Sequence, residues 1–259
     1  MLRKFLLHSI VIVCLLKYFL IPIPVYATIS EVTSFGTSGS GNGQFNAPAD
    51  VAIDGSLNFY IVDQNNNRVE VFNNSITYVS QWGSTGSGPG QFNSPTGITF
   101  DLLYDLYVVD TGNNRVQKFE SDGTYISEFG GLGSGDGDLD QPYGIAVDAS
   151  NNIYVTDLGN KRVSVFDSDG NFIKNIGSAG SGDGQFNGPS GIAIDADGSI
   201  YVADAVNNQI QVFDEDGSFI RRFGSTGTSD GQFTLASGIA LDGTGSIFVT
   251  SIMDSRIQR

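Results

Sequence analysis

The stretch that decides the fold is residues 142–177, PYGIAVDASNNIYVTDLGNKRVSVFDSDGNFIKNIG. Its four short apolar or alternating runs predict β-strands at 144–148, 152–156, 162–166 and 171–176. Polar turn residues separate the runs, and in Asp167-Ser-Asp-Gly170 the glycine can supply the positive φ that a hairpin needs. Four antiparallel strands without a helical period predict one blade of a β-propeller.

The same pattern recurs five times along the chain at a constant spacing. An apolar residue followed by Gly ends each fourth strand, and these glycines are at 36, 83, 130, 177 and 224, a step of 47 residues each time. This period lies between those of WD and kelch propeller repeats, whereas a β-solenoid would have a shorter period. The sequence therefore predicts an all-β protein, a β-propeller of four-stranded antiparallel blades built from five 47-residue repeats.

The repeat also resembles a known family. Each copy approximates Pro-x-Gly-Ile-Ala-x-Asp, then Ile-Tyr-Val-x-Asp, then Asn-x-Arg-Val-x-x-Phe, which is similar to the NHL repeat. The resemblance covers residues 35–259 and implies a propeller, for which related proteins usually have six blades. It implies no single function, because proteins that share this fold act in different ways.

The fifth repeat has only three predicted strands, at 239–242, 246–250 and 255–258. The segment Ile29-Ser-Glu-Val-Thr-Ser-Phe-Gly36 matches the fourth strand of other copies, so we expect it to complete the last blade and close the ring. The alternative is that the chain is a fragment of a six-bladed ring, because the other copies continue to a Phe just where this chain ends.

The N-terminus has the order of a secretory signal peptide. Arg3 and Lys4 precede a mostly apolar stretch, and Val25-Tyr26-Ala27 places small or modest residues before a cleavage site. An uncleaved membrane anchor is the alternative, although Lys17 interrupts the apolar stretch. We expect a signal peptide at 1–27, a propeller at 28–259, and a secreted or cell-surface protein without a membrane span after cleavage.

The predicted mature chain lacks two side chains that enzymes often use. The only His, His8, and the only Cys, Cys14, lie within the predicted signal peptide. A Ser-His-Asp triad, a cysteine nucleophile and a His-ligated metal site are therefore excluded from residues 28–259. Propellers that resemble this one include lyases that use His, and gluconolactonase-like enzymes that hold a divalent metal with carboxylates.

Acidic residues dominate the predicted mature chain. Because Arg3, Lys4 and Lys17 lie in the signal peptide, residues 28–259 keep 10 of the 13 Lys and Arg and all 28 Asp and Glu, a formal net charge of −18. Such a surface repels phosphate backbones, so we expect no nucleic-acid partner. We expect a monomer that binds a protein, peptide or glycan.

Loops on a rigid frame often carry function. In a propeller, the loops before each inner strand and those between the second and third strands share one face. Positions that differ among matching repeats are candidates for specificity. We therefore expect a ligand to contact two sets of residues, namely Thr96, Tyr143, Ser190 and Ser237 after the Pro position, and Gln64, Thr111, Leu158, Val206, Ile252 and Met253 in the second set of loops.

Two recurring charged positions predict ion pairs within the blades. We expect each carboxylate to accept N–H groups of its turn and to pair with a nearby guanidinium, the residues being Asp63, Asp110, Asp157 and Asp204 with Arg68, Arg115, Arg162 and Arg256. Carboxylates could instead hold Ca²⁺, for which additional loop candidates are Asp136, Asp138, Asp183 and Asp230. None has EF-hand spacing, and we expect no cofactor, with calcium as the alternative.

Together these patterns favour a non-enzymatic, extracytoplasmic binding scaffold that presents a loop face to a ligand. The alternative is a divalent-metal-dependent hydrolase of the gluconolactonase-like type.

Overall fold

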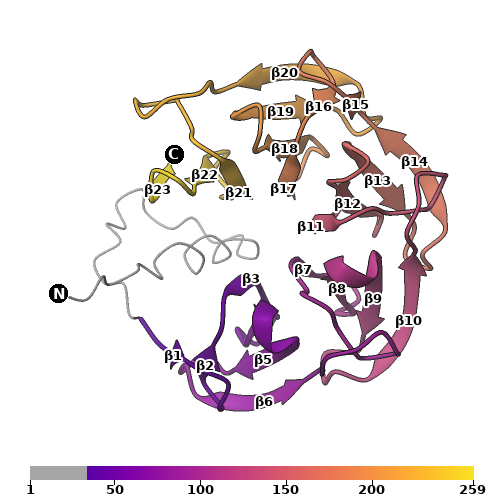
Figure 1. Cartoon of the computed structure of the whole chain (residues 1–259), viewed down its shortest axis with the longest axis vertical. Coiled ribbons are helices and arrows are strands. Elements are labelled where there is room, and N and C mark those ends of the chain that lie inside the picture. The colour runs from indigo at the N-terminus through magenta and orange to yellow at the C-terminus, as the bar shows by residue number, and fades with distance from the viewer. Residues whose placement is uncertain (1–33) are drawn as a thin grey trace.

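The computed structural model describes residues 34–259, and the predicted signal peptide lies outside them. Its strands form five sheets arranged as the blades of a propeller, which confirms the predicted fold class (Figure 1). Blade 1 contains β3 (Pro48–Ile53), β4 (Phe59–Asp63), β5 (Arg68–Phe72) and β6 (Tyr78–Trp82). Blade 2 contains β7 (Ile98–Phe100), β8 (Leu106–Asp110), β9 (Arg115–Phe119) and β10 (Tyr125–Gly130).

The remaining blades repeat this order from the inner to the outer strand. Blade 3 contains β11 (Pro142–Val147), β12 (Ile153–Asp157), β13 (Arg162–Phe166) and β14 (Phe172–Ile176). Blade 4 contains β17 (Pro189–Ile194), β18 (Ile200–Asp204), β19 (Gln209–Phe213) and β20 (Phe219–Phe223). Blade 5 contains three described strands, β21 (Ala236–Leu241), β22 (Ile247–Ser251) and β23 (Arg256–Gln258).

Short elements lie in the connections. Two parallel pairs, β1 (Thr37–Ser38) with β2 (Gln44–Phe45) and β15 (Ser178–Ala179) with β16 (Gln185–Phe186), fold Gly-rich segments back on themselves before an inner strand. Two 3₁₀ turns, η1 (Gln64–Asn66) and η2 (Thr111–Asn113), connect the second and third strands of blades 1 and 2.

The blades follow one another round a common axis. The inner strands β3, β7, β11, β17 and β21 contact each other in this order, and blades 1 and 5 are the two ends of the series (Figure 1). The segment expected to complete blade 5, residues 29–36, lies mostly outside the described residues, so its closing role stays a prediction. Of this segment, Phe35 packs against Phe72 of blade 1, with ring centroids 5.1 Å apart.

Apolar side chains fill the spaces between neighbouring blades. All five residues of β8 and of β12 are buried, because middle strands are covered on both faces by the adjacent blades. The outer strand β6 instead alternates between half-buried and exposed residues, since only one of its faces meets a neighbour. Phe92 and Phe186 are fully buried and join clusters that link blade 1 to blade 2 and blade 3 to blade 4.

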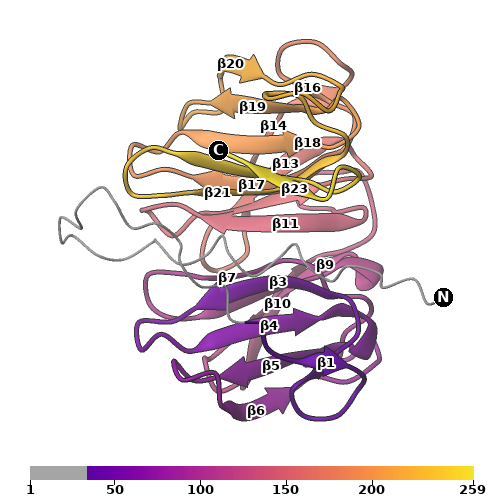
Figure 2. The same cartoon turned by 90° about the vertical axis from the view of Figure 1, so that its left-hand side faces the viewer.

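The antiparallel order places the connections on two opposite faces, visible edge-on in Figure 2. We call the loop face the one that carries the Gly-rich segments before the inner strands and the loops between second and third strands. We call the turn face the opposite one, which carries the turns between first and second and between third and fourth strands.

Candidate functional site

The recurring Asp residues of the loop face are buried at the ends of the second strands. Asp63, Asp110, Asp157 and Asp204 are each 0% exposed. In blade 1, Asp63 accepts hydrogen bonds from the backbone N–H of Asn46 (2.7 Å), the Asn66 amide (2.7 Å) and Arg68 Nε (2.8 Å). Asp110 and Asp157 repeat this set with Arg115 and Arg162, each at 2.9 Å. These carboxylates are therefore occupied by their own blades.

The paired Arg residues also hold the Gly-rich segments. Arg115 Nη2 donates to the carbonyls of Gly88 (2.9 Å) and Gln91 (3.0 Å), and its Nη1 lies 2.7 Å from Glu128. Arg68 and Arg162 contact equivalent carbonyls in their own blades. Because the same register places Asp and Arg opposite each other across the loop, one ion pair fixes both connections of the loop face.

Blades 4 and 5 depart from this arrangement. Blade 4 has Gln209 at the Arg position, but Arg222 on β20 donates to the Ser181 carbonyl at 2.9 Å and pairs with Asp183 at 3.2 Å. In blade 1 the two positions are reversed, with Arg68 on the third strand and Gln81 on the fourth.

In blade 5, the carboxylate lies at a different position of the loop. Ser251 occupies the recurring Asp position and accepts a hydrogen bond from Thr234 N at 2.8 Å. The acidic group is Asp254, which accepts from Ser251 Oγ at 2.8 Å and lies 3.6 Å from Arg256 Nε. The pair is therefore looser here than in blades 1 to 3.

Asn side chains tie the loops of blades 1, 2 and 4 to the next blade. Asn67 Oδ1 accepts from Ser94 N at 2.7 Å, Asn114 Oδ1 from Gln141 N at 2.8 Å, and Asn208 Oδ1 from Leu235 N at 2.6 Å. In blade 3, Lys161 Nζ donates instead to the Asn187 carbonyl at 2.7 Å, so a hydrogen-bonded rim runs along the loop face from blade 1 to blade 5.

The predicted ligand residues after the Pro position lie inside this rim, at the axis. Thr96, Ser190 and Ser237 are only 3%, 6% and 8% exposed. Thr96 Oγ1 donates to the Tyr143 carbonyl (2.7 Å) and Ser190 Oγ to the Ser237 carbonyl (3.2 Å), so both link adjacent blades. Their part in ligand binding stays a prediction.

Tyr143 reaches across the axis. Burial raises the pKa of its phenol, a hydrogen bond with Ser237 of blade 5 opposes this, and the charge of Asp50 of blade 1 adds to it. The side chain therefore lies among blades 1, 3 and 5, and its part in ligand binding stays a prediction.

The second predicted set of ligand residues divides by exposure. Gln64, Thr111 and Leu158 are half-buried, and Thr111 Oγ1 donates to the Pro142 carbonyl at 2.8 Å. Val206, Ile252 and Met253 are 54%, 48% and 71% exposed. Leu235, which sequence reasoning missed, is 36% exposed and accepts a hydrogen bond from Ile252 N at 3.2 Å.

These four residues form one patch. The Asn208–Leu235 hydrogen bond brings the loop that carries Val206 against the Gly-rich segment of blade 5, which in turn contacts the loop of Ile252 and Met253. We call this set, Val206, Leu235, Ile252 and Met253, the loop-face patch. Three of its members, Val206, Ile252 and Met253, belong to the second predicted set of ligand residues.

The calcium candidates are dispersed over separate loops. Asp138 accepts a hydrogen bond from Gly135 N at 2.9 Å, and Asp183 pairs with Arg222, while Asp136 and Asp230 are exposed. Among residues 34–259, no group of three or more His, Cys, Asp or Glu side chains is placed to hold a metal ion. Within the same residues, no helix is long and apolar enough to cross a membrane.

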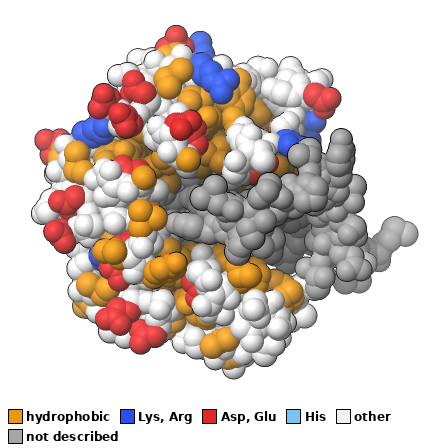
Figure 3. Space-filling view, turned by 180° about the vertical axis from the view of Figure 1, so that it is seen from behind, with side chains coloured by type: hydrophobic (Ala, Val, Ile, Leu, Met, Phe, Trp, Pro, Cys, Tyr) orange, Lys and Arg blue, Asp and Glu red, His pale blue; other side chains and the backbone are white. Residues whose placement is uncertain are grey.

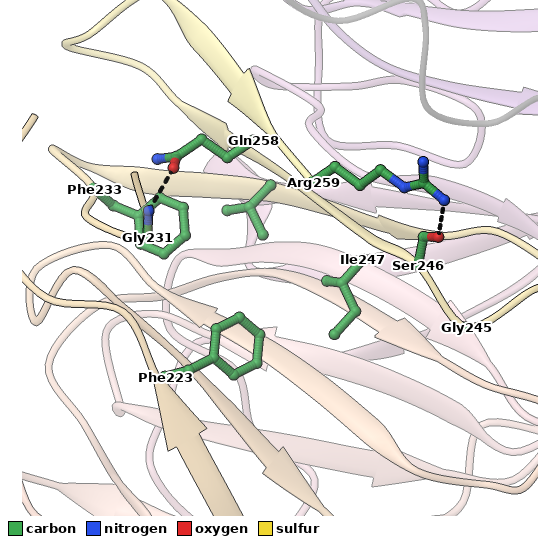
Figure 4. A pocket seen from close by; sticks show the side chains of 9 residues that line it. Phe223, Gly231, Phe233, Gly245, Ser246, Ile247, Gln258 and Arg259 are labelled. Atoms are coloured by element: carbon green, nitrogen blue, oxygen red, sulfur yellow. Dashed lines mark hydrogen bonds between the residues drawn. The ribbon is translucent and has the colours of Figure 1, made fainter. Parts of the chain in front are cut away.

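A pocket of about 300 Å³ lies at the outer side of blade 5 (Figure 4). Phe223, Phe233 and Ile247 line it, and two hydrogen bonds close its rim, Gly231 N to Gln258 Oε1 and Arg259 Nη2 to Ser246 Oγ. In blades 1 to 4, a Phe that ends the third strand packs in the equivalent space, namely Phe72, Phe119, Phe166 and Phe213. The pocket thus belongs to the blade-to-blade packing.

The repeat matches known protein families. An NHL repeat matches residues 186–213, a 6-bladed beta-propeller matches 54–129 and 147–199, and a beta-propeller repeat matches 124–156. The chain is therefore an NHL-type β-propeller protein, as its repeat pattern indicates. No curated protein sequence matches it at a significant level.

Solved structures with a similar fold carry different activities. A streptogramin B lyase has a TM-score of 0.64 and 17% identity over 85% of this chain and 66% of that chain. A gluconolactonase from Xanthomonas campestris has 0.61 and 18% over 83% and 75%. An auxiliary nutrient binding protein from Bacteroides thetaiotaomicron has 0.62 and 14% over 85% and 59%. The chain thus spans about two thirds of the lyase's length, and identities this low show the fold alone.

Proposed function

We propose that the protein is a non-enzymatic scaffold that acts outside the cytoplasm and binds a protein, peptide or glycan through its loop face. The loop-face patch carries this proposal, because it places four exposed apolar side chains on a rim that hydrogen bonds hold in shape. Exposed apolar clusters rimmed by polar groups are typical of interaction sites. A peptide segment with a bulky apolar side chain fits this surface best.

The chemistry of the loop face supports binding over catalysis. The conserved geometry of Asp63, Asp110 and Asp157 commits both carboxylate oxygens of each to N–H donors and Arg, so they are poorly placed to ligate a metal or accept a substrate proton. The His on which the resembling lyases depend has no counterpart after His8. The gluconolactonase-like alternative would need an unpaired acid cluster at the axis.

A selection experiment tests this function. Short random peptides displayed on phage are selected on the purified protein and then on a variant with Ile252→Thr and Met253→Gly, which introduces the Thr111-Gly112 pair of blade 2. We expect peptides that bind the wild-type protein and lose about tenfold or more of their affinity on the variant, as measured by calorimetry. A glycan array probed with both proteins covers carbohydrate ligands.

Two results would overturn the proposal. One is that neither peptides nor glycans distinguish the two proteins. The other is hydrolysis of a sugar lactone by the wild-type protein with added divalent metal, which would favour the gluconolactonase-like alternative.

A further inference from the structure

A second apolar patch lies on the turn face, in the turns between the first and second strands of blades 1 and 2. Leu57 is 52% exposed, and Leu102, Leu103 and Tyr104 are 47%, 70% and 56% exposed. The same turns in the other blades carry small or polar residues, Ala149-Ser-Asn151, Ala196-Asp-Gly198 and Gly243-Thr-Gly245. We call Leu57, Leu102, Leu103 and Tyr104 the turn-face patch.

The backbone conformation of these turns favours Asn or Gly over the bulky residues that blades 1 and 2 carry. The position before the second strand is left-handed in every blade, and Asn151 (φ 62°), Gly198 (φ 83°) and Gly245 (φ 86°) suit it. Blades 1 and 2 place Leu57 (φ 63°) and Tyr104 (φ 68°) there. Bulky side chains with positive φ are strained, and such strain gathers at functional sites.

An ion pair unique to blade 2 anchors its turn. Lys118 occupies the position that is Val71, Val165 and Val212 in blades 1, 3 and 4. Its ammonium lies 2.9 Å from Asp105, which stands where blade 3 has Asn152. Burial acts to lower the pKa of Lys118, but hydrogen bonds with Tyr107 and Asp105 outweigh it and raise the pKa, so the ammonium stays charged.

The base of the turn is equally fixed. Asp101 is 3% exposed, and its Oδ1 accepts hydrogen bonds from Leu103 N (2.8 Å) and Asp105 N (2.9 Å). Its Oδ2 accepts from Tyr107 Oη at 3.2 Å. The two exposed leucines therefore sit on a backbone that cannot relax away from solvent.

Both neighbouring blades brace the patch. Leu102 N donates to Asn151 Oδ1 of blade 3 at 3.0 Å. On the other side, Tyr104 lies against Gly55 of blade 1, where an added Cβ would come within 2.9 Å of the phenol oxygen. Three blades thus hold the patch in one conformation, as a preformed binding surface requires.

Acidic groups lie in the turns of blade 2 on the same face. Glu120 and Asp122 are exposed on the neighbouring turn, and Asp105 keeps part of its carboxylate in solvent. Burial raises the pKa of Tyr60 of blade 1 to about 12, and the negative charges of Asp54 and Asp122 add to this effect. Figure 3 views this face and shows hydrophobic groups interspersed with acidic ones.

We propose that the turn-face patch is a second binding surface, for a protein segment whose bulky apolar side chain is flanked by Lys or Arg. The apolar residues bury the anchor side chain, and the acidic groups on the same face select cationic flanks. The same acidic groups would repel an anionic lipid surface, so a protein segment is favoured over a membrane. The inference concerns the opposite face from the loop-face patch and does not depend on it.

The chain supplies its own matched control. The variant Leu102→Ala, Leu103→Ser and Tyr104→Asn gives blade 2 the turn of blade 3. We expect it to melt at or above the wild-type temperature, because Asn adopts positive φ more readily than Tyr. A melting temperature at or above that of the wild type would show that a loss of binding by this variant does not arise from misfolding.

Phage-displayed peptides are selected on the wild-type protein and counter-selected on the blade-3 turn variant. We expect the surviving peptides to carry an aromatic or aliphatic residue flanked by Lys or Arg, to bind the variant about tenfold more weakly or worse, and to lose affinity with added salt. The Ile252→Thr, Met253→Gly variant should bind them like wild type, which separates this surface from the loop face.

Three outcomes would overturn the proposal. The first is that no peptide distinguishes the wild-type protein from the turn variant. The second is that the distinguishing peptides lack basic residues and bind independently of salt. The third is turn-dependent binding to phosphatidylcholine vesicles without any peptide binding, which would make the patch a membrane contact.

Discussion

The loop between β22 and β23 of blade 5 and the turn between β7 and β8 of blade 2 both expose large apolar residues, but they are anchored differently. In the blade 5 loop, Ser251 stands in place of the recurring Asp, and Arg256 Nε lies 3.6 Å from Asp254 without a hydrogen-bond partner. In the blade 2 turn, the additional pair of Lys118 with Asp105 is 2.9 Å long.

The exposed apolar residues of the blade 5 loop thus lie on a weakly held backbone, whereas those of the blade 2 turn lie on a firmly held one. A surface held in one conformation loses less entropy when it binds, whereas a looser loop can adjust to several ligands. We expect the turn-face patch to recognise a narrow class of segments and the loop-face patch to accept a broader one.

The largest expected change in stability comes from the loop face, where Asp157 of blade 3 forms an ion pair and Ser251 of blade 5 stands at the same position of its repeat. Asp157→Ala leaves the guanidinium of Arg162, whose side chain is 12% exposed, without its carboxylate. We expect a loss of about 3–5 kcal/mol in the free energy of unfolding, because the unpaired charge stays largely buried. Ser251→Ala removes the hydrogen bonds of its hydroxyl with Thr234 N and with the Asp254 carboxylate but leaves no buried charge unpaired, so it should cost only about 1.5–2 kcal/mol. Urea unfolding of both variants measures the difference, and equal losses would contradict the account.

A smaller loss of stability is expected when the ion pair of the blade 2 turn is removed. Lys118→Val installs the residue of three other blades but leaves Asp105 and Asp101 without their cation. We expect a loss of about 1–3 kcal/mol, because Asp105 can still be partly hydrated. Adding Asp105→Asn, the residue of blade 3, should recover most of it. Purely additive effects of the two substitutions would show that the pair does not anchor the turn.

A still smaller effect concerns Glu70, where blades 2, 4 and 5 have Gln117, Gln211 and Gln258. Burial raises the pKa of Glu70, and the Arg68 guanidinium 3.1 Å away only partly opposes this. A carboxyl whose pKa is raised on folding contributes stability that is present below its unfolded pKa and is lost as pH rises through the folded pKa. Glu70→Gln should therefore raise the melting temperature near about pH 7, and the gain should vanish below about pH 4.

Melting curves of the two proteins across this pH range test the sign. A Glu70→Gln variant that melts below wild type near about pH 7 would show that the pair with Arg68 outweighs the burial of the carboxylate.

The fold followed directly from the repeat. A constant step of 47 residues places equivalent side chains in equivalent environments, so the strands, the propeller and the opposition of Asp to Arg could all be read from the sequence. The structure describes the third repeat with strands close to those predicted, differing by a few residues at their ends.

The position of individual loop residues could not be read in the same way. Thr96, Ser190 and Ser237 follow the Pro position but turn toward the axis, where five inner strands converge and little solvent reaches them. Leu235 escaped notice because it is a single apolar residue, with φ 65°, inside a Gly-rich segment. Its equivalents in blades 1 to 4 are Ala47, Ser94, Gln141 and Gly188, so a bulky apolar side chain at this position occurs only in blade 5.

The turn-face patch was visible in the sequence but went unrecognised. Lys118 stands where blades 1, 3 and 4 have Val and blade 5 has Arg259, and Asp105 stands where the other blades have Asn or Ser, so only blade 2 combines a cation with a carboxylate at these positions. Only the structure shows that these residues meet at 2.9 Å, because Asp105 lies in the turn before β8 and Lys118 lies on β9.

The central claim is that the recurring carboxylates of the loop face are structural and that binding depends on apolar surface. The most direct measurement is the melting temperature of the purified protein in millimolar calcium and again in excess chelator. Because a ligand that binds only the folded state raises the melting temperature, the account predicts the same midpoint in both conditions. A clear rise with calcium would contradict it, and would make the acidic loops around Asp136, Asp138, Asp183 and Asp230 a metal site.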